Sequence, residues 1–208
     1  MNWLAHLYLS PPDDPEFRLG NLLADFIKGG ARRELGENFL RGIRCHEAID
    51  AFTDFHPVVQ RSRARIAPQH GHFSGILIDV FYDHFLACNW LRFSPDTSLD
   101  DFVNAVHAAA PHHLAGLPET ARAAVLRIIA DDRLRSYREV AGIGAALERL
   151  SVYLAARLHR PVALERAIVE LVAQQQELET DFLEFFPQLC ARVAAWQDDF
   201  ATPSQPAY

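Results

Sequence analysis

Three ionisable side chains stand inside one apolar stretch, and this feature limits what the chain can fold into. Residues 76–86 read Ile-Leu-Ile-Asp-Val-Phe-Tyr-Asp-His-Phe-Leu, which leaves Asp79, Asp83 and His84 little solvated face to occupy. Burying an ionised group costs several kcal/mol unless a partner or a metal compensates its lost hydration. The stretch therefore predicts a helix whose polar groups meet partners inside the molecule.

The same four-residue spacing recurs in three other segments. Residues four apart lie on one face of a helix, so each segment offers two polar side chains side by side. The pairs are Asn2 and His6, Asn21 and Asp25, His46 and Asp50 with Asp54 one turn further, and Asp79 and Asp83 with His84 adjacent. If the four faces point inward together, they form a compact Asp/His/Asn cluster.

The residue types of such a cluster indicate metal chemistry. Carboxylates and imidazoles suit Mn²⁺, Mg²⁺, Fe²⁺ or Zn²⁺, and the absence of thiolates from the set argues against a soft metal. A bound divalent ion makes water a stronger nucleophile and polarises a phosphoryl oxygen. The sequence contains no Gly-x-Ser-x-Gly elbow, phosphate-binding glycine loop or dinucleotide fingerprint. A metal-dependent hydrolase is therefore the first hypothesis.

Each of these residues also has a structural explanation. A lone His6 is commonly a hydrogen-bonded core histidine, Asp25 is able to cap a turn, and His46 with Asp50 is able to form an ordinary pair on a solvated face. For any one residue the structural explanation is the commoner one. The four coincident pairs favour a functional site.

The rest of the chain predicts an all-α, single-domain multi-helix bundle. Stretches rich in Ala, Leu, Arg and Glu alternate with prolines, and no hairpin signal occurs. We expect eight to ten helices in one domain over residues 1–200, with a loose tail at 201–208. Because proline lacks the N–H, Pro57, Pro68 and Pro187 are expected at helix starts or in loops. Ser98 followed by Asp101 predicts a helix N-terminus.

Charge and cysteine content narrow the class of protein. The net charge is −7, which argues against a general nucleic-acid binder. No apolar run reaches the length of a bilayer, and the amino end lacks the basic region of a signal peptide, so we expect no membrane partner. Cys45, Cys88 and Cys190 form no CxxC pair. A cytoplasmic protein is the simplest expectation.

At these residues the sequence resembles the acyl carrier protein phosphodiesterases. No single block is diagnostic, but their ordered combination is specific and spans nearly the whole chain. The matching blocks are residues 1–7 and 20–26, Gly42-Ile43, His46, Ile49-Asp50, Thr53-Asp54, Asp79-Val80, residues 83–86, Tyr153-Leu154, Arg157, Arg160-Pro161, Asp181-Phe182 and residues 185–187.

The resemblance implies an all-helical, HD-domain-like phosphohydrolase that depends on Mn²⁺, with Mg²⁺ or Fe²⁺ as alternatives. It implies hydrolysis of the phosphodiester that joins 4′-phosphopantetheine to holo-acyl carrier protein. The chain has no adjacent His-Asp pair and carries Asp83-His84 in the reverse order. On the resemblance, Asp25, His46, Asp50, Asp79 and His84 supply the metal ligands, and His6, Asn21 and Asp83 hold those ligands in place or act as acid–base groups.

The partner implied by the resemblance is an acidic protein, holo-acyl carrier protein. Arg61, Arg63 and Arg65 form a local basic run, and we expect this run to dock the carrier. Two other hypotheses remain open: an HD-like phosphohydrolase of a nucleotide or small phosphodiester, and a non-enzymatic helical module that binds the carrier protein. The sequence does not predict the oligomeric state.

Overall fold

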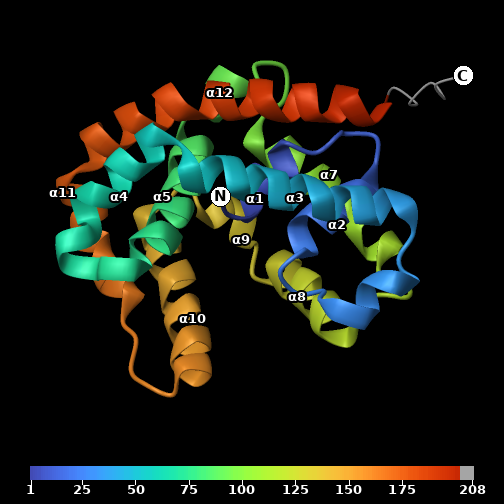
Figure 1. Ribbon diagram of the computed structural model, residues 1–208, viewed down its shortest axis with the longest axis horizontal. Coiled ribbons are helices and arrows are strands. Elements are labelled where there is room, and N and C mark those ends of the chain that lie inside the picture. Colours follow the sequence, from blue (N-terminus) through green and yellow to red (C-terminus); the bar gives the residue numbers. More distant parts are fainter. Residues whose placement is uncertain (202–208) are drawn as a thin grey trace, which may run out of the picture.

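The computed structural model describes residues 1–201 and is all-helical over that part of the chain (Figure 1). Its α-helices are α1 Trp3–Tyr8, α2 Pro15–Leu23, α3 Glu37–Phe55, α4 Pro57–His70, α5 Ser74–Cys88, α6 Trp90–Phe93, α7 Leu99–Ala109, α8 Glu119–Ala130, α9 Arg133–Ser136, α10 Val140–Leu158, α11 Ile168–Ala173 and α12 Gln175–Ala201. Four 3₁₀ segments connect them: η1 Gly29–Glu34, η2 Gly71–Phe73, η3 Ala110–His113 and η4 Leu164–Ala167. The predicted all-α class is confirmed, and the HD-like label stays a prediction.

The helix count exceeds the expected eight to ten, because several helices last only one or two turns. The twelve α-helices of the described residues include α6 and α9, each four residues long. No periodic pattern in the sequence predicts either one. The predicted tail at 201–208 lies, apart from Ala201, outside the described residues.

Proline placement agrees with the prediction at some helix starts and differs at two positions. Pro57 is the first residue of α4, where its missing N–H has no intrahelical partner to lose. Pro68 and Pro187 instead lie inside α4 and α12. In α12 the buried Phe186 and Leu189 flank the exposed Pro187, and their packing holds the helix together across it. The predicted cap is confirmed, since Ser98 Oγ accepts from the Asp101 N–H at 3.0 Å.

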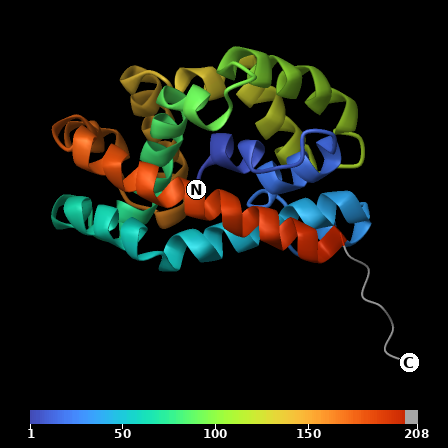
Figure 2. The same cartoon turned by 90° about the horizontal axis from the view of Figure 1, so that it is seen from above.

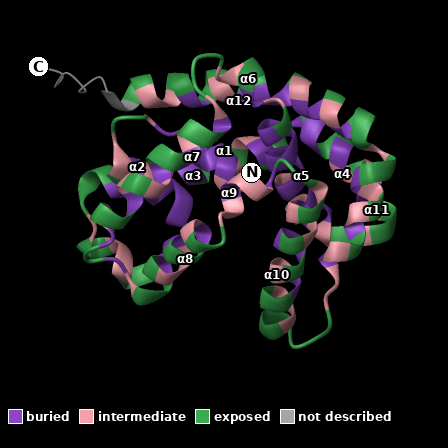
Figure 3. Ribbon diagram, turned by 180° about the vertical axis from the view of Figure 1, so that it is seen from behind, coloured by how far each residue is buried: buried purple, intermediate pink, exposed green. Residues whose placement is uncertain are grey.

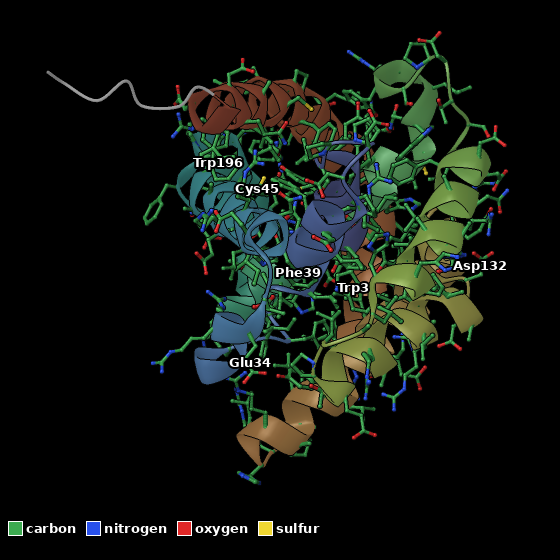
Figure 4. All side chains as sticks on the ribbon, turned by 90° about the vertical axis from the view of Figure 1, so that its right-hand side faces the viewer. Trp3, Glu34, Phe39, Cys45, Asp132 and Trp196 are labelled. Carbon is green, nitrogen blue, oxygen red and sulfur yellow. The ribbon has the colours of Figure 1, made fainter. Side chains whose placement is uncertain are left out.

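The first two helices lie at the centre of the molecule. Figure 4 shows α1 and α2 between α3 on one side and α7 and α8 on the other. The long helix α12 packs against α3, α4 and α5 (Figure 2). The aromatic side chains of Phe182, Phe185 and Phe186 anchor it, and all three are fully buried. This arrangement brings the amino-terminal segment against α3 and α5, the helices that carry most of the predicted ligands.

The helix α10 projects from this body. It begins beside α5 and extends away from α12, and its outer half is largely exposed (Figure 3). Within the described residues, no helix is long and apolar enough to cross a membrane.

Candidate metal centre

Two histidines and one aspartate, contributed by two helices, meet at the amino-terminal side of the core. His6 comes from α1, and His46 and Asp50 come from α3. Ligand atoms of these three side chains all lie within 4.8 Å of one another. The His6 Nε2 atom lies 3.3 Å from Asp50 Oδ1, and His46 Nε2 lies 3.1 Å from Asp50 Oδ2. The two imidazole rings stack at 4.0 Å.

Asn21 of α2 orients both imidazoles. Its side-chain oxygen lies 2.8 Å from His6 Nδ1, and its backbone carbonyl lies 2.7 Å from His46 Nδ1. The Asn21 amide group donates to the His6 carbonyl and to Ser10 Oγ, which fixes which way the side chain points. Both Nδ1 atoms therefore carry the hydrogen, and both Nε2 atoms face Asp50.

This hydrogen-bond pattern fits a cation. His6 Nε2 faces the Met1 carbonyl oxygen at 3.2 Å as well as the Asp50 carboxylate, so every neighbour named around the ring is an acceptor. A neutral imidazole has one N–H, and in His6 this group already donates to Asn21. The Nε2 nitrogen therefore points its lone pair at the lone pairs of two oxygens. A metal-binding histidine ordinarily has this arrangement, with Nδ1–H held by an oxygen and Nε2 free to bind. The residues present therefore fit a divalent ion.

The charges in the cluster are strongly coupled. Burial lowers the pKa of His6, and the neighbouring His46 lowers it further. Burial alone would also lower the pKa of His46, but the hydrogen bond and charge of Asp50, the Asn21 carbonyl and the charge of Asp25 together outweigh burial and raise it. Burial alone would raise the pKa of Asp50, yet the Met1 amino group and the two histidines hold it far below its usual range. Asp50 is thus an anion under all ordinary conditions.

Asp79 of α5 lies on the other side of the Met1 amino group. That nitrogen lies 3.1 Å from Asp79 Oδ1 and 3.4 Å from Asp50 Oδ1. Burial opposes its charge, but Asp79 and Asp50 prevail and raise the pKa of the amino group to about 10. Two carboxylates from different helices therefore face a single positive charge.

The remaining predicted residues lie at different distances from the cluster. Asp25 lies just beyond the end of α2 rather than on its face, and its carboxylate is 3.8 Å from His46 Nε2. His84 lies outside the three-residue group, and its Nδ1 donates to the Tyr137 carbonyl at 2.7 Å. Its assignment as a ligand stays a prediction.

Asp83 binds the backbone rather than the cluster side chains. Its carboxylate accepts from the Leu4 N–H at 2.7 Å and from the Ala5 N–H at 3.2 Å, which are free donors in the first turn of α1. Burial raises the pKa of Asp83 to about 7, against the lowering effect of these two hydrogen bonds. Asp83 thus caps the first turn of α1. Its acid–base role stays a prediction.

The three predicted docking arginines are all in ion pairs. Arg61 and Arg65 both contact the buried carboxylate of Asp181, and Arg63 contacts Asp54 at 2.6 Å. Their charges are compensated within the protein, and their role in docking stays a prediction.

Two contributors had no counterpart in the sequence analysis. Tyr137, just before α10, accepts a hydrogen bond from Asn2 on its hydroxyl and from His84 on its carbonyl. The Met1 amino group links two carboxylates. No periodic pattern marks either one, because both act through contacts between distant segments.

Comparison with known proteins identifies the family. The family model described as acyl carrier protein phosphodiesterase matches residues 1–189. The chain belongs to the acyl carrier protein phosphodiesterase family. A protein of that name from Pectobacterium atrosepticum is 32% identical over 91% of this chain and 95% of its own length. Those from Serratia proteamaculans and Yersinia enterocolitica are 33% and 31% identical, over 91% and 92% of this chain and 95% and 97% of their own lengths.

No solved structure matches the chain. The family assignment therefore rests on sequence, and the arrangement of the site rests on the geometry described above.

Proposed function

We propose that this protein is a divalent-metal-dependent phosphodiesterase that removes the 4′-phosphopantetheine arm from holo-acyl carrier protein. The observation that carries the proposal is the meeting of His6, His46 and Asp50 in a member of this family. The names of the curated relatives support the substrate class. Mn²⁺ is the ion that the family resemblance implies, and the donor set of imidazole and carboxylate suits it as well as Mg²⁺, Fe²⁺ or Zn²⁺.

In this proposal His6, His46 and Asp50 hold the ion, with Asp79 and Asp25 at the edge of the site. Such an ion would supply Lewis-acid stabilisation of a phosphoryl oxygen and a lowered pKa for the attacking water. The chain's own contribution is orientation. Asn21 keeps each Nε2 lone pair directed inward, and Asp50 holds the negative charge that balances the ion.

The site is closed on one side and open on the other. His6 is 1% exposed, whereas the side chains of Asp50 and Asp25 are 40% and 76% exposed. A substrate therefore approaches from the side of Asp25 and Asp50. An open approach suits a phosphodiester that is attached to the surface of another protein.

The direct test is incubation of the purified protein with holo-acyl carrier protein, with and without Mn²⁺, read by intact mass. We expect the carrier to lose the mass of one phosphopantetheine in the presence of the metal only. An unchanged mass with Mn²⁺, Mg²⁺ and Fe²⁺, together with hydrolysis of small phosphodiesters, would favour the small-substrate hypothesis. Tight carrier binding without metal binding or turnover would favour the non-enzymatic module.

Substitution of the proposed ligands provides the second test. His46→Ala and Asp79→Ala should each lower kcat by at least about 100-fold and leave far-UV circular dichroism unchanged, because each removes a group of the centre. Asp54→Asn is the matched control, since Asp54 is on the same helix one turn beyond Asp50 and pairs with Arg63 instead. Full activity in both alanine variants would contradict the assignment.

A further inference from the structure

The outer part of α10 and the loop after it form a basic segment in an acidic protein. Residues 149–164 contain three arginines and no Asp or Glu, in a chain whose net charge is −7. The arginines are Arg149, Arg157 and Arg160. The segment also exposes apolar side chains, with Val152 68% and Tyr153 58% exposed. An exposed surface that combines arginine, tyrosine and valine has the composition of a protein interface.

Three of these residues line up along one face of the helix. Arg149, Tyr153 and Arg157 are four residues apart, and an Arg157 nitrogen lies 3.4 Å from the Tyr153 hydroxyl. The row spans about 12 Å at the rise of an α-helix. We call Arg149, Val152, Tyr153 and Arg157 the α10 face.

The inner end of α10 packs against α5, the helix that carries Asp79 and His84, and against α9. Burial lowers the pKa of Arg149, and the positive charge of Arg133 lowers it further, while Tyr137 and the more distant carboxylates of Asp131 and Glu148 oppose them. Tyr137 in turn contacts Asn2 and His84. The helix α10 therefore starts next to α5 and α9 and runs outward from there (Figure 1).

The charges of the α10 face are available to a partner. Among the described residues, no carboxylate lies within ion-pair distance of Arg149 or Arg157. Arg61 and Arg65 differ, because Asp181 already binds both of them. An uncompensated cation attracts an acidic partner more strongly than a compensated one, and it does so over the distance at which two proteins first meet.

We propose that the α10 face docks the acidic carrier protein, with Arg149 and Arg157 pairing with its carboxylates and Val152 and Tyr153 packing on its apolar surface. This inference rests on the proposed function. The phosphodiester joins the arm directly to a serine of the carrier, so the surface of the carrier must come up to the metal centre. A docking surface has to lie near the site, and α10 packs against α5, the helix that carries Asp79 and His84.

The test compares charge reversal on α10 with the same change elsewhere. The variants are Arg157→Glu and Tyr153→Ala, and the matched control is Arg192→Glu, an exposed arginine on α12, the helix from which α10 extends away (Figure 1). Apo-carrier protein serves as the binding probe because it carries no cleavable arm, and holo-carrier protein serves for kinetics with Mn²⁺. The dissociation constant of apo-carrier and the KM of holo-carrier are each measured at low and high salt.

We expect each α10 variant to raise the dissociation constant of apo-carrier and the KM of holo-carrier by roughly tenfold at low salt, with kcat within about twofold of the unmodified protein. Arg157→Glu should also weaken the salt dependence of KM. Arg192→Glu should change neither constant by more than about twofold. A fall in kcat of the α10 variants without a change in KM would overturn the docking role.

The outcomes separate this inference from the proposed function. If the unmodified protein cleaves holo-carrier and the α10 variants behave like Arg192→Glu, docking by the α10 face is overturned and the activity stands. If the unmodified protein binds apo-carrier through the α10 face but never cleaves holo-carrier, docking is supported and the proposed function fails. Absence of any binding to either carrier form would overturn the docking role.

Discussion

At the scale of single residues, one buried asparagine sets the chemistry of the centre. Asn21 is fully buried and contacts His6 through its side chain and His46 through its backbone. Because only the side-chain contact depends on residue type, a substitution at position 21 releases His6 and leaves the backbone contact to His46. Asn21 is thus a positioning residue for one of the two imidazoles.

We expect Asn21→Ala to weaken Mn²⁺ binding by about 10- to 100-fold, the usual cost of losing a group that orients a metal ligand. Calorimetric titration with Mn²⁺ measures the dissociation constant of the ion in each variant. Ser10→Ala is the control, because it removes only a hydrogen-bond partner of the Asn21 amide and should have a smaller effect. Unchanged affinity in Asn21→Ala would contradict the positioning role of Asn21.

At the scale of helices, α2 and α3 approach so closely that only glycine fits at their contact. A Cβ atom on Gly42 would lie 2.0 Å from the Phe17 carbonyl oxygen and 2.8 Å from the Asn21 backbone nitrogen. A Cβ atom on Gly20 would lie 2.1 Å from the Phe39 carbonyl oxygen. This contact holds Asn21 of α2 against His46 of α3, so packing of the two helices and geometry of the site are linked.

Gly42→Ala should therefore lower both stability and activity. Forcing a methyl group against a backbone carbonyl costs about 1–3 kcal/mol or more in the free energy of unfolding, and relief of the clash separates Asn21 from His46. Gly144→Ala in α10 is the matched control, because the nearest atom to its Cβ would be 3.8 Å away. That variant should be neutral or stabilised by up to about 1 kcal/mol, since alanine favours the helix. Urea denaturation and a turnover assay on both variants test the pair, and equal behaviour would contradict the close contact.

The first turn of α1 depends on a carboxylate from α5. The Asp83 carboxylate binds two backbone N–H groups that a short helix of six residues leaves free. Asp83→Ala should lower the free energy of unfolding by about 2–3 kcal/mol, because it leaves buried donors without partners. Asp79→Ala, four residues earlier on the same helix and with a side chain that is 24% exposed, should cost less. A stability loss in Asp83→Ala no larger than that of Asp79→Ala would contradict this role.

At the scale of the whole molecule, a buried carboxylate on α12 binds α4, which is more than 100 residues earlier in the chain. Asp181 of α12 accepts from Arg61 at 2.8 Å, Arg65 at 3.1 Å and Ser62 at 2.8 Å, all on α4. Ser62 Oγ in turn lies 2.8 Å from the hydroxyl of Tyr82 on α5. Burial alone would raise the pKa of Asp181, but the hydrogen bonds from Arg61, Arg65 and Ser62 outweigh it and lower the pKa.

The lowered pKa predicts a pH dependence of stability. A carboxyl group with a lower pKa in the folded state stabilises the fold above its unfolded pKa of about 4, and the contribution is lost as the pH falls through the folded value. At pH 7 we expect Asp181→Asn to lower the free energy of unfolding by about 1–3 kcal/mol, reduced from the usual cost because both arginines are partly exposed.

The difference between the unmodified protein and Asp181→Asn should shrink as the pH falls from about 5 towards 3. Urea denaturation at a series of pH values measures it. Glu184→Gln is the control, because Glu184 also contacts Arg61 but is 50% exposed, and it should change stability by less than about 1 kcal/mol. A pH-independent difference for Asp181→Asn would contradict the role of its charge.

The helical class and several local features could be predicted from the sequence because they depend on neighbours along the chain. Helix-forming composition and three- and four-residue periodicity predicted an all-α fold, and Ser98 with Asp101 predicted a helix start. The pair His46 and Asp50 was predicted to share a face, and the structure places both in the cluster. These properties are set within one or two turns of a helix.

The tertiary structure decided which of the predicted polar residues meet. It brought His6 into contact with Asp50, gave the Asp83 carboxylate to the backbone of α1, and paired Arg61 and Arg65 with Asp181 across 120 and 116 residues of chain. Within the described residues, it also left the arginines of the α10 face without a carboxylate at ion-pair distance. Periodicity fixes the direction of a side chain from its own helix axis, whereas these contacts depend on how separate helices pack, which is a property of the whole core.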